Sequence, residues 1–327
     1  MTSRDVVLKA IRFEGPERLP LLFRTAPDRS DIVCASYTMP SGWQARASDV
    51  DEWGCKWSNL VGAGTGHIVC NPLADIESLA GCAFPDPRAA GRFDSVPQFV
   101  RKYPDKYVAG SMGLSGFNLM MGLRGFVGLM VDLWLNRDFL ADLTDVIWNF
   151  ESAIIEQYAD RGVHGVWFYD DWGMDRALFI NPELWREVFK PLYRKEFKLA
   201  HDRGLHVFFH SCGYVWDIIR DLIEIGADCL NLEQPCIFGK GEENGIDLLA
   251  RDFGGKVCFC TNPDLQTTLS LSSPDEVYAE AKHIVEVFRR FNGGLIALAD
   301  CGKDANIVPR RNLEAMAHAF VSSNPSV

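Results

Sequence analysis

The feature that most limits the fold of this sequence is a regular alternation of short apolar segments with longer amphipathic ones. Candidate strands follow residue 105, at 107–110, 165–169, 205–209, 229–232, 256–260 and 295–299. Helical patterns lie between them, at 182–204, 214–226, 245–254 and 274–294. Strands that alternate with helices form a parallel sheet, because each helix returns the chain to the edge where the next strand starts.

An apolar segment at 19–23 adds one more candidate strand, after an amphipathic helix at 3–13 for which Ser3 is the candidate N-cap. The strands are then one short of a closed eight-stranded barrel, and we expect the missing strand between Gly113 and Asn136. The sequence predicts an α/β fold, a TIM-type (β/α)8 barrel with an N-terminal elaboration. A doubly wound open sheet is the alternative.

The chain has the length and composition of one domain. Its 327 residues suit a single large barrel, and no Pro-, Gly- or Ser-rich tract is long enough to be a linker. We predict one barrel domain over 1–327, with an irregular N-terminal elaboration at 26–104. In that elaboration, 54–60 and 66–73 resemble the strands of a hairpin. The glycines between them lack the strand and helix context of a nucleotide loop.

Charge excludes some classes of partner. The formal net charge is −11, which argues against nucleic acid and against anionic membranes. The first twenty residues carry charges throughout, unlike a secretory signal, and the longest apolar stretch, 125–135, is interrupted by Asp132. We therefore expect a cytoplasmic protein, in which most of the ten cysteines are reduced.

Polar and thiol side chains follow the ends of the candidate strands. In a barrel, the loops after the strands meet on one rim, where the chemistry of such enzymes takes place. The residues at these positions are Arg24, Asp170, Asp171, Trp172, His210, Cys212, Glu233, Gln234, Thr261, Asp300 and Cys301.

Four of these residues form a candidate zinc site. A His-x-Cys pair alone is weak support, but Cys301 and Glu233 follow other strands on the same rim. One imidazole nitrogen, two thiolates and a carboxylate are a suitable tetrahedral set for Zn²⁺. The sequence predicts His210, Cys212, Cys301 and Glu233 as metal ligands, and buried core positions remain the alternative for the cysteines.

Other residues have two interpretations each. Cys258 and Cys260 alternate along a strand and are assigned to the core. Asp170 and Asp171 are either a helix-capping, solvated pair or part of the wall of a substrate pocket. Arg24 is either a surface charge or an anion-binding residue. Trp172 is either an exposed aromatic at the barrel mouth or a core residue. We take Arg24, Asp170, Asp171 and Trp172 as candidate substrate-binding residues.

The chain resembles the uroporphyrinogen decarboxylase superfamily over nearly its whole length. The resemblance rests on "SRDVVLKAIRFEGPERLPL", "DEWGCKW", "FPDP", "INPELWREVFKPLYRKEF", "HSCG" with "LIEIGAD", and "GGLIALADCGKDANIVPRRNLEAM". Within the superfamily it is similar to the cobalamin-dependent methyltransferases, which include methylcobalamin:coenzyme M methyltransferases. The zinc motif of that branch is His-x-Cys followed by a distant Cys, which matches His210, Cys212 and Cys301.

A second resemblance concerns Glu233. Cobalamin-independent methionine synthase, another zinc barrel that alkylates a thiol, has a Glu roughly twenty residues beyond its His-x-Cys pair, and Glu233 lies 21 residues beyond Cys212. The true decarboxylases, by contrast, carry an arginine-rich N-terminal segment, which "FRTAPDRSD" matches poorly.

These resemblances imply a zinc-dependent methyltransferase. It would move a methyl group between a methyl-corrinoid, held on a corrinoid carrier protein, and a small acceptor such as the thiol of coenzyme M or a folate. A free thiol is mostly protonated at neutral pH, and a zinc ion converts a bound thiol to its nucleophilic thiolate. A porphyrinogen decarboxylase is the alternative function, and a non-enzymatic barrel that binds zinc or a corrinoid protein is a third.

Overall fold

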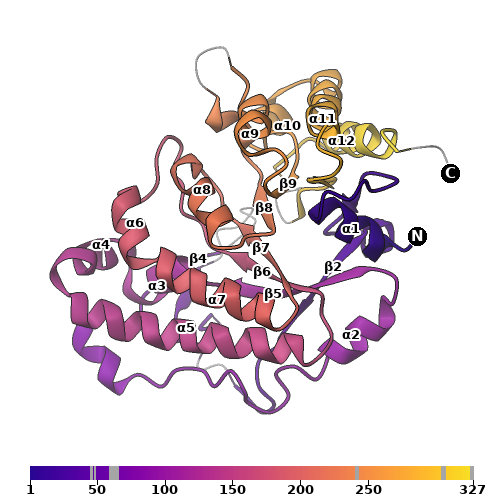
Figure 1. The fold of residues 1–327 in the computed structure, drawn as a ribbon. Helices are drawn as coiled ribbons and strands as arrows, with labels where there is room; N and C mark the ends of the chain where they lie inside the picture. The colour runs from indigo at the N-terminus through magenta and orange to yellow at the C-terminus, as the bar shows by residue number, and fades with distance from the viewer. Residues whose placement is uncertain (45–46, 48, 59–65, 240–242, 303–306, 325–327) are drawn as a thin grey trace.

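A nearly closed barrel of eight parallel strands, surrounded by helices, is the framework of the molecule (Figure 1). It is seen in a computed structural model that describes residues 1–327 except 45–46, 48, 59–65, 240–242, 303–306 and 325–327. The barrel strands are β1 (Leu21–Leu22), β2 (Ile32–Ser36), β5 (Tyr107–Leu114), β6 (Gly165–Tyr169), β7 (His206–His210), β8 (Cys229–Leu232), β9 (Cys258–Thr261) and β10 (Leu295–Leu298). Neighbours in the order β1-β10-β9-β8-β7-β6-β5-β2 pair in parallel. The predicted (β/α)8 barrel is confirmed.

The helices lie outside the barrel or close one end of it. They are α1 (Ser3–Ile11), α2 (Val96–Lys102), α3 (Gly116–Arg124), α4 (Phe126–Leu135), α5 (Arg137–Ala159), α6 (Pro182–Val188), α7 (Lys190–Asp202), α8 (Trp216–Glu224), α9 (Gly245–Phe253), α10 (Thr268–Leu271), α11 (Pro274–Arg289) and α12 (Arg310–Val321). Short 3-10 helices are η1 (Pro27–Arg29), η2 (Ile76–Gly81) and η3 (Pro235–Phe238).

Helix α1 closes the end of the barrel where the strands begin. The Gly294 amide, just before β10, donates to the Ala10 carbonyl at 2.8 Å. On the inner side of α1, Val7 and Ile11 join the apolar cluster that fills the barrel. The opposite end, where the strands finish, is therefore the end left for loops and chemistry.

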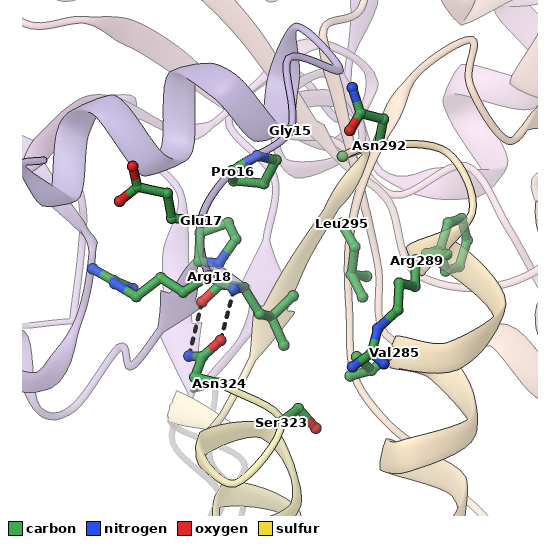
Figure 2. A pocket seen from close by; sticks show the side chains of 14 residues that line it. Gly15, Pro16, Glu17, Arg18, Val285, Arg289, Asn292, Leu295, Ser323 and Asn324 are labelled. Carbon is green, nitrogen blue, oxygen red and sulfur yellow. Dashed lines mark hydrogen bonds between the residues drawn. The ribbon is translucent and has the colours of Figure 1, made fainter. Parts of the chain in front are cut away.

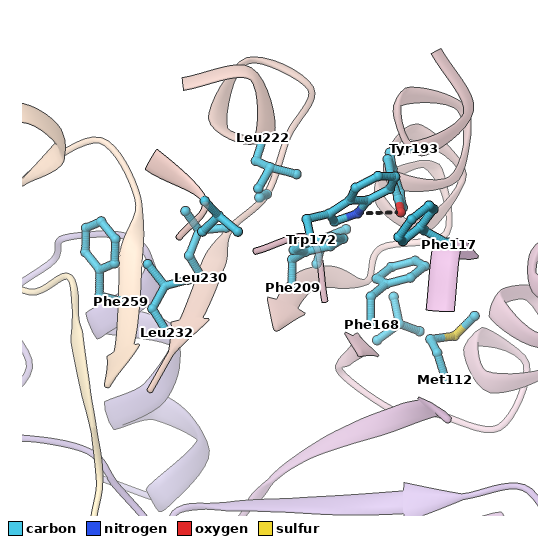
Figure 3. Close-up of a cluster of buried hydrophobic side chains, with 14 of the residues drawn as sticks. Met112, Phe117, Phe168, Trp172, Tyr193, Phe209, Leu222, Leu230, Leu232 and Phe259 are labelled. Carbon is cyan, nitrogen blue, oxygen red and sulfur yellow. Dashed lines mark hydrogen bonds between the residues drawn. The ribbon is translucent and has the colours of Figure 1, made fainter. Parts of the chain in front are cut away.

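Side chains alternate between the inside and the outside of the barrel, as β-strand geometry requires. Trp167 and Phe208 belong to the interior cluster, and so do Cys258 and Cys260, which are fully buried as predicted. The next residues in the same strands, such as Phe168 and Phe209, point outward into the layer between strands and helices. Figure 3 shows that outer layer, including Met112, Phe117, Trp172, Tyr193, Leu230 and Phe259.

The seam between β1 and β2 is closed by side chains. The Leu21 amide donates to the Asp31 carboxylate at 2.8 Å, and the Phe23 amide donates to the Ser30 hydroxyl at 3.0 Å. One backbone bond, from the Asp31 amide to the Leu21 carbonyl at 2.8 Å, adds to them. β1 and β2 are the first and last strands of the sheet. Between them, the side chains of Ser30 and Asp31 make hydrogen bonds in place of part of the backbone ladder.

The eighth strand lies elsewhere than expected. It is β2, Ile32–Ser36, inside the segment assigned to the elaboration, whereas the expected position between Gly113 and Asn136 forms helices α3 and α4. A strand of five residues that is not followed directly by a helix is too short to be recognised from hydrophobic periodicity alone. The predicted hairpin is present, because β3 (Lys56–Ser58) pairs antiparallel with β4 (His67–Cys70). Its loop falls outside the described residues.

Two helix predictions need correction in detail. The N-cap of α1 is Thr2, which forms a capping box with Asp5, while the Ser3 hydroxyl donates to Asp31 at 2.6 Å. The helical pattern at 182–204 is divided into α6 and α7 near Phe189. Pro191 lacks the amide that would continue the first helix, which explains the break.

Candidate metal centre

Asp171, His210 and Cys212 come together at the carboxyl end of the barrel. Strands β6 and β7 are paired with Tyr169 opposite His210, so the residues just beyond them are neighbours. The donor atoms of the three side chains all lie within 4.8 Å of one another. His210 Nε2 is 3.4 Å from Cys212 Sγ and 3.5 Å from Asp171 Oδ1. The structure thus groups the predicted His-x-Cys pair with a carboxylate that sequence analysis assigned to substrate binding.

Two close backbone approaches hold this group in place. The Cys212 amide donates to Asp171 Oδ1 at 2.6 Å, which ties the two loops directly. Gly213 has a φ of +76°, and a Cβ atom there would lie 2.1 Å from the Gly173 carbonyl oxygen. Only glycine allows both the left-handed conformation and this approach. The glycine of the "HSCG" motif is therefore required for the loop after β6 to reach the loop after β7.

Asn231 determines which ring nitrogen of His210 faces the group. The Asn231 amide nitrogen donates to the Cys260 carbonyl at 2.9 Å, so its oxygen points the other way. That oxygen lies 2.8 Å from His210 Nδ1. An oxygen that can only accept requires a proton on Nδ1, which leaves the lone pair of Nε2 directed toward Cys212 and Asp171. This is the tautomer that a metal bound through Nε2 needs.

Glu233 lies on the other side of the imidazole ring. Its Oε1 is 3.6 Å from His210 Nδ1 and accepts a hydrogen bond from Arg24 at 2.5 Å. Burial works against the charges of both partners. The carboxylate nevertheless raises the pKa of Arg24, and the guanidinium holds the pKa of Glu233 below its usual range. Glu233 is thus a buried carboxylate whose charge is already balanced by Arg24.

Cys301 and Asp300 follow β10 on the same rim. The Asp300 carboxylate accepts from the backbone amides of Arg24 and Thr25, at 2.9 and 2.8 Å, which fixes the start of the loop after β1. Cys301 itself is buried. Within the described part of the chain, the group of donor atoms inside 4.8 Å includes neither Cys301 nor Glu233.

Asp170 and Trp172 are interior residues. The Asp170 carboxylate accepts from the amides of Phe117 and Asn118, at 3.0 and 2.8 Å, and so caps the start of α3. The Trp172 ring stacks on Phe117 with 4.1 Å between centroids, and its indole N–H donates to the Tyr193 hydroxyl (Figure 3). Both side chains are fully buried. Trp172 is therefore a core residue and not an exposed aromatic at the barrel mouth, and Asp170 is a buried helix cap.

Sequence reasoning missed two members of the site. The sequence predicts Asp171 as a substrate-binding residue and not as a ligand, because the direction of a side chain beyond a strand end depends on the loop. Asn231 was not recognised at all, although a signal was present: it is the polar residue of the apolar strand "CLNL" and comes two residues before Glu233. The pairing of Asn231 with His210 across β7 and β8 makes the contact.

The donor set fits a borderline-soft dication. An imidazole nitrogen, a thiolate sulfur and a carboxylate oxygen are the ligand types that Zn²⁺ takes, and two anionic donors would balance its charge. The Asp171 side chain is 38 % exposed and that of His210 is 11 % exposed. A small ligand can therefore reach the group from the barrel mouth.

A separate pocket lies at the opposite end of the barrel. It has a volume of about 300 Å³ and lies between segment 15–20, the end of α11 and the end of α12 (Figure 2). Two of its polar groups already have partners: Arg18 pairs with Asp31, and the Asn324 amide pairs with the backbone of Leu19. Since the barrel end where strands begin serves stability, we place the functional site at the other end.

Comparisons with known proteins agree with this fold. A family model described as uroporphyrinogen decarboxylase (URO-D) matches residues 60–322. No curated protein matches the chain in sequence. Among solved structures, the chain is similar to a methyltransferase from Methanosarcina mazei, with a TM-score of 0.74, 16% identity, and coverage of 98% of this chain and 99% of that chain. At this identity the likeness concerns the fold.

Weaker likenesses involve sugar epimerases. A 3-keto-D-glucoside 4-epimerase from E. coli has a TM-score of 0.45 and 12% identity, covering 78% of this chain and 95% of that chain. A D-psicose 3-epimerase from Clostridium cellulolyticum has a TM-score of 0.43 and 10% identity, covering 71% and 82%. These scores are too low to carry a functional argument.

Proposed function

Because the chain belongs to the uroporphyrinogen decarboxylase family, we propose that it is a zinc-dependent methyltransferase of that family. The observation that carries the proposal is the group of Asp171, His210 and Cys212 at the carboxyl end of the barrel. A family member that only removed carboxyl groups would have no use for a thiol and an imidazole held this close. In our proposal the methyl group moves between a methyl-corrinoid, presented by a carrier protein, and a small acceptor, for which a thiol is the first choice.

When bound, zinc would supply one function: it would lower the pKa of a thiol acceptor so that the thiolate is present at neutral pH. His210 would contribute Nε2, and Cys212 and Asp171 would contribute sulfur and oxygen. Cys301 remains a proposed ligand, and Glu233 would have to leave Arg24 before it could become one. Arg24 is the proposed contact for an anionic group of the acceptor, at the mouth of the barrel.

The methyl transfer itself needs alignment more than proton transfer. When bound, a methyl-corrinoid would supply the methyl group to the acceptor sulfur, and its cobalt would keep the electron pair of the carbon–cobalt bond. The thiol proton would leave to solvent when the acceptor binds, before the methyl group moves. The rigid loops after β6 and β7, tied by the Cys212–Asp171 hydrogen bond, would hold the acceptor in line.

The first test is the metal content of matched variants. We expect the purified wild type to hold about one zinc per chain, and Cys212→Ala and His210→Ala to lose it. Asp171→Ala should weaken binding more than Glu233→Gln, because Glu233 is paired with Arg24. Cys258→Ala is the control, since that thiol lies inside the barrel. Absence of metal in carefully prepared wild type, or its full retention in Cys212→Ala, contradicts the metal centre.

The second test separates the proposed reaction from decarboxylation, which the name of the family model raises. Zinc-loaded protein is mixed with methylcobalamin and a panel of thiols and folates, and the cobalamin spectrum is followed with and without a chelator. We expect demethylation of the cobalamin that stops when zinc is removed. Release of carbon dioxide from uroporphyrinogen that survives zinc removal would assign the decarboxylase function instead. A metal site that accepts no thiol would indicate a non-enzymatic barrel.

A further inference from the structure

Asn262 is a buried polar side chain without a partner. It follows β9 directly, and its exposed fraction is 0%. Within the described part of the chain, neither its amide nitrogen nor its amide oxygen makes a hydrogen bond. A side-chain amide can donate twice and accept twice, and burying it without partners destabilises a fold. Such a residue is expected where another molecule supplies the missing partners.

The loop that carries Asn262 is held firmly at other points. The Asp264 carboxylate, which is fully buried, accepts from the Cys236 amide at 3.2 Å. The Leu265 amide donates to the Glu233 carbonyl at 3.1 Å. Both bonds tie the loop after β9 to the loop after β8. The missing partners of Asn262 are therefore not the result of a poorly anchored loop.

The position of Asn262 places it on the rim that holds the candidate metal centre. Cys260 belongs to the interior cluster of the barrel, and Asn262 is the next residue of β9 in the same phase. Residues in that phase after the two neighbouring strands, Glu233 after β8 and Asp300 after β10, both bond to Arg24 on this rim. Asn262 lies between them in the strand order.

Asn262 is also close enough to the metal group for one small molecule to contact both. Leu232 of β8 pairs with Thr261 of β9, so Glu233 and Asn262 come side by side after them. Strand β7, which ends at His210, is the other neighbour of β8. Neighbouring strands are about 4.8 Å apart, so the positions of His210 and Asn262 are separated by roughly 10 Å or less. A thiol at the metal group can thus carry a second polar group that reaches Asn262.

We propose that Asn262 binds a carboxamide or lactam group of the methyl acceptor, an inference that rests on the proposed methyltransferase function. A group with N–H next to C=O supplies an acceptor to the Asn262 nitrogen and a donor to its oxygen at the same time. A carboxylate leaves the Asn262 oxygen without a donor and lies beside the buried Glu233 carboxylate. An apolar group leaves both Asn262 atoms unpaired. An anionic group elsewhere on the acceptor still has Arg24 as its contact.

The first measurement is the thermal stability of two variants of the full chain, without added acceptor. Leu has a shape close to that of Asn and needs no partners, so Asn262→Leu should raise the melting temperature by about 2 °C or more. Asn312→Leu is the matched control. Asn312 is equally buried, but its amide nitrogen donates to the Leu269 and Ser272 carbonyls, both at 2.9 Å, so this variant should melt at a lower temperature. If Asn262→Leu also melts at a lower temperature, Asn262 is bonded within the protein through water, and the proposal is overturned.

The second measurement is the preference among three thiols of similar shape. They are 3-mercaptopropionamide, 3-mercaptopropionate and 3-methyl-1-butanethiol, which end in a carboxamide, a carboxylate and an apolar branch. With zinc-loaded protein and methylcobalamin, we expect the highest kcat/KM for the carboxamide. Asn262→Leu should reduce the ratio of kcat/KM between the carboxamide and the apolar thiol at least about tenfold. An unchanged ratio overturns the proposal, because a residue that only supports the fold affects all three thiols alike.

A fourth acceptor identifies the source of the amide group. Tetrahydrofolate contains a lactam in its ring, so a reaction with tetrahydrofolate that is lost in Asn262→Leu, without reaction of the thiols, assigns the site to a lactam.

Failure of the proposed function gives a different result. If the wild type demethylates methylcobalamin with none of the four acceptors, the methyltransferase proposal is wrong, and Asn262 is judged by binding alone. The wild-type melting temperature should then rise more with 3-mercaptopropionamide than with 3-methyl-1-butanethiol, and Asn262→Leu should remove this difference. Equal shifts of the wild type with both compounds overturn the role of Asn262 as well.

Discussion

At the scale of single residues, Asn231 connects the two halves of the candidate metal centre. Its oxygen faces His210 Nδ1 and also accepts from Arg24 at 3.0 Å, and its nitrogen is anchored on the Cys260 carbonyl. The residue touches no proposed ligand atom, but it selects the tautomer of His210 and positions the Arg24 guanidinium between itself and Glu233. It is therefore a positioning residue for the proposed site.

Substitution of Asn231 tests this role. We expect Asn231→Leu, which keeps the volume but removes the acceptor, to lower metal affinity about 10- to 100-fold. Asn231→Asp retains an acceptor for the Nδ1 proton and should recover part of the affinity. The measurement is a titration with Co²⁺ followed by its absorption bands, on protein shown to be folded. Wild-type affinity in Asn231→Leu would rule out the positioning role.

At the scale of elements, helices α5 and α7 meet through buried carboxyl groups. Glu151 on α5 accepts from the Gly116 amide at 2.7 Å, and its carboxyl lies next to that of Glu196 on α7, so a proton on one can bond to the other. Apart from that contact, the other Glu151 oxygen and both Glu196 oxygens have no hydrogen-bond partner in the described structure. Asp170 and Tyr193 complete this buried group. Burial raises the pKa of the Glu151 carboxyl to about 7, and burial together with the Glu151 charge raises the pKa of Glu196 as well.

This pair should make stability depend on pH. An acid with a raised pKa keeps its proton in the folded state while the unfolded chain loses it, so stability falls as pH rises above about 4.5, through about 7 for Glu151 and further for Glu196. A Gln at position 196 supplies a permanent donor and removes one charge. We expect Glu196→Gln to have the wild-type melting temperature near pH 4.5 and a higher one above pH 7. Thermal unfolding across this range checks it.

Glu187→Gln is the control for that experiment. The Glu187 side chain is 66% exposed on α6, so its substitution should shift stability by less than about 0.5 kcal/mol at every pH. A difference between Glu196→Gln and wild type that stays constant from pH 4.5 to 7 would mean that the buried pair does not bind an extra proton.

At the scale of the whole molecule, barrel closure depends on Asp31. Its carboxylate accepts from the Ser3 hydroxyl at 2.6 Å, from the Leu21 amide at 2.8 Å and from the Arg18 guanidinium at 2.5 Å. It therefore joins α1, the segment before β1 and the seam next to β2. Asp31 is 4% exposed, so water cannot replace these bonds without opening the seam.

We expect Asp31→Ala to lower the free energy of unfolding by about 3 kcal/mol or more, because it leaves a buried amide and a partly buried guanidinium unpaired. Asp28→Ala is the matched control: the same change at an exposed position three residues earlier should cost less than about 0.5 kcal/mol. Urea unfolding of both variants measures the difference. Equal midpoints for the two would show that the seam does not depend on this carboxylate.

Local patterns in the sequence were sufficient for the barrel class and for part of the site. Alternating strands and helices identify a parallel (β/α)8 sheet, because periodicity is a property of neighbouring residues. His210 and Cys212 are adjacent in space for the same reason: two positions apart at a strand end, their side chains leave the chain on the same side. The assignment of Cys258 and Cys260 to the core also follows from their strand.

Tertiary structure alone decided the remaining features. Ile32–Ser36 forms the eighth strand of the barrel because it pairs with β5. The five residues of this strand contain no sequence pattern that identifies β5 as their partner. Asp171 reaches His210 and Cys212 in the candidate metal centre, and Glu233 is held by Arg24, because the path of each loop determines the direction of its side chains. Trp172 is buried for the same reason. A sequence specifies which residues stand at the strand ends, but the contacts between separate loops depend on how the closed barrel brings those ends together.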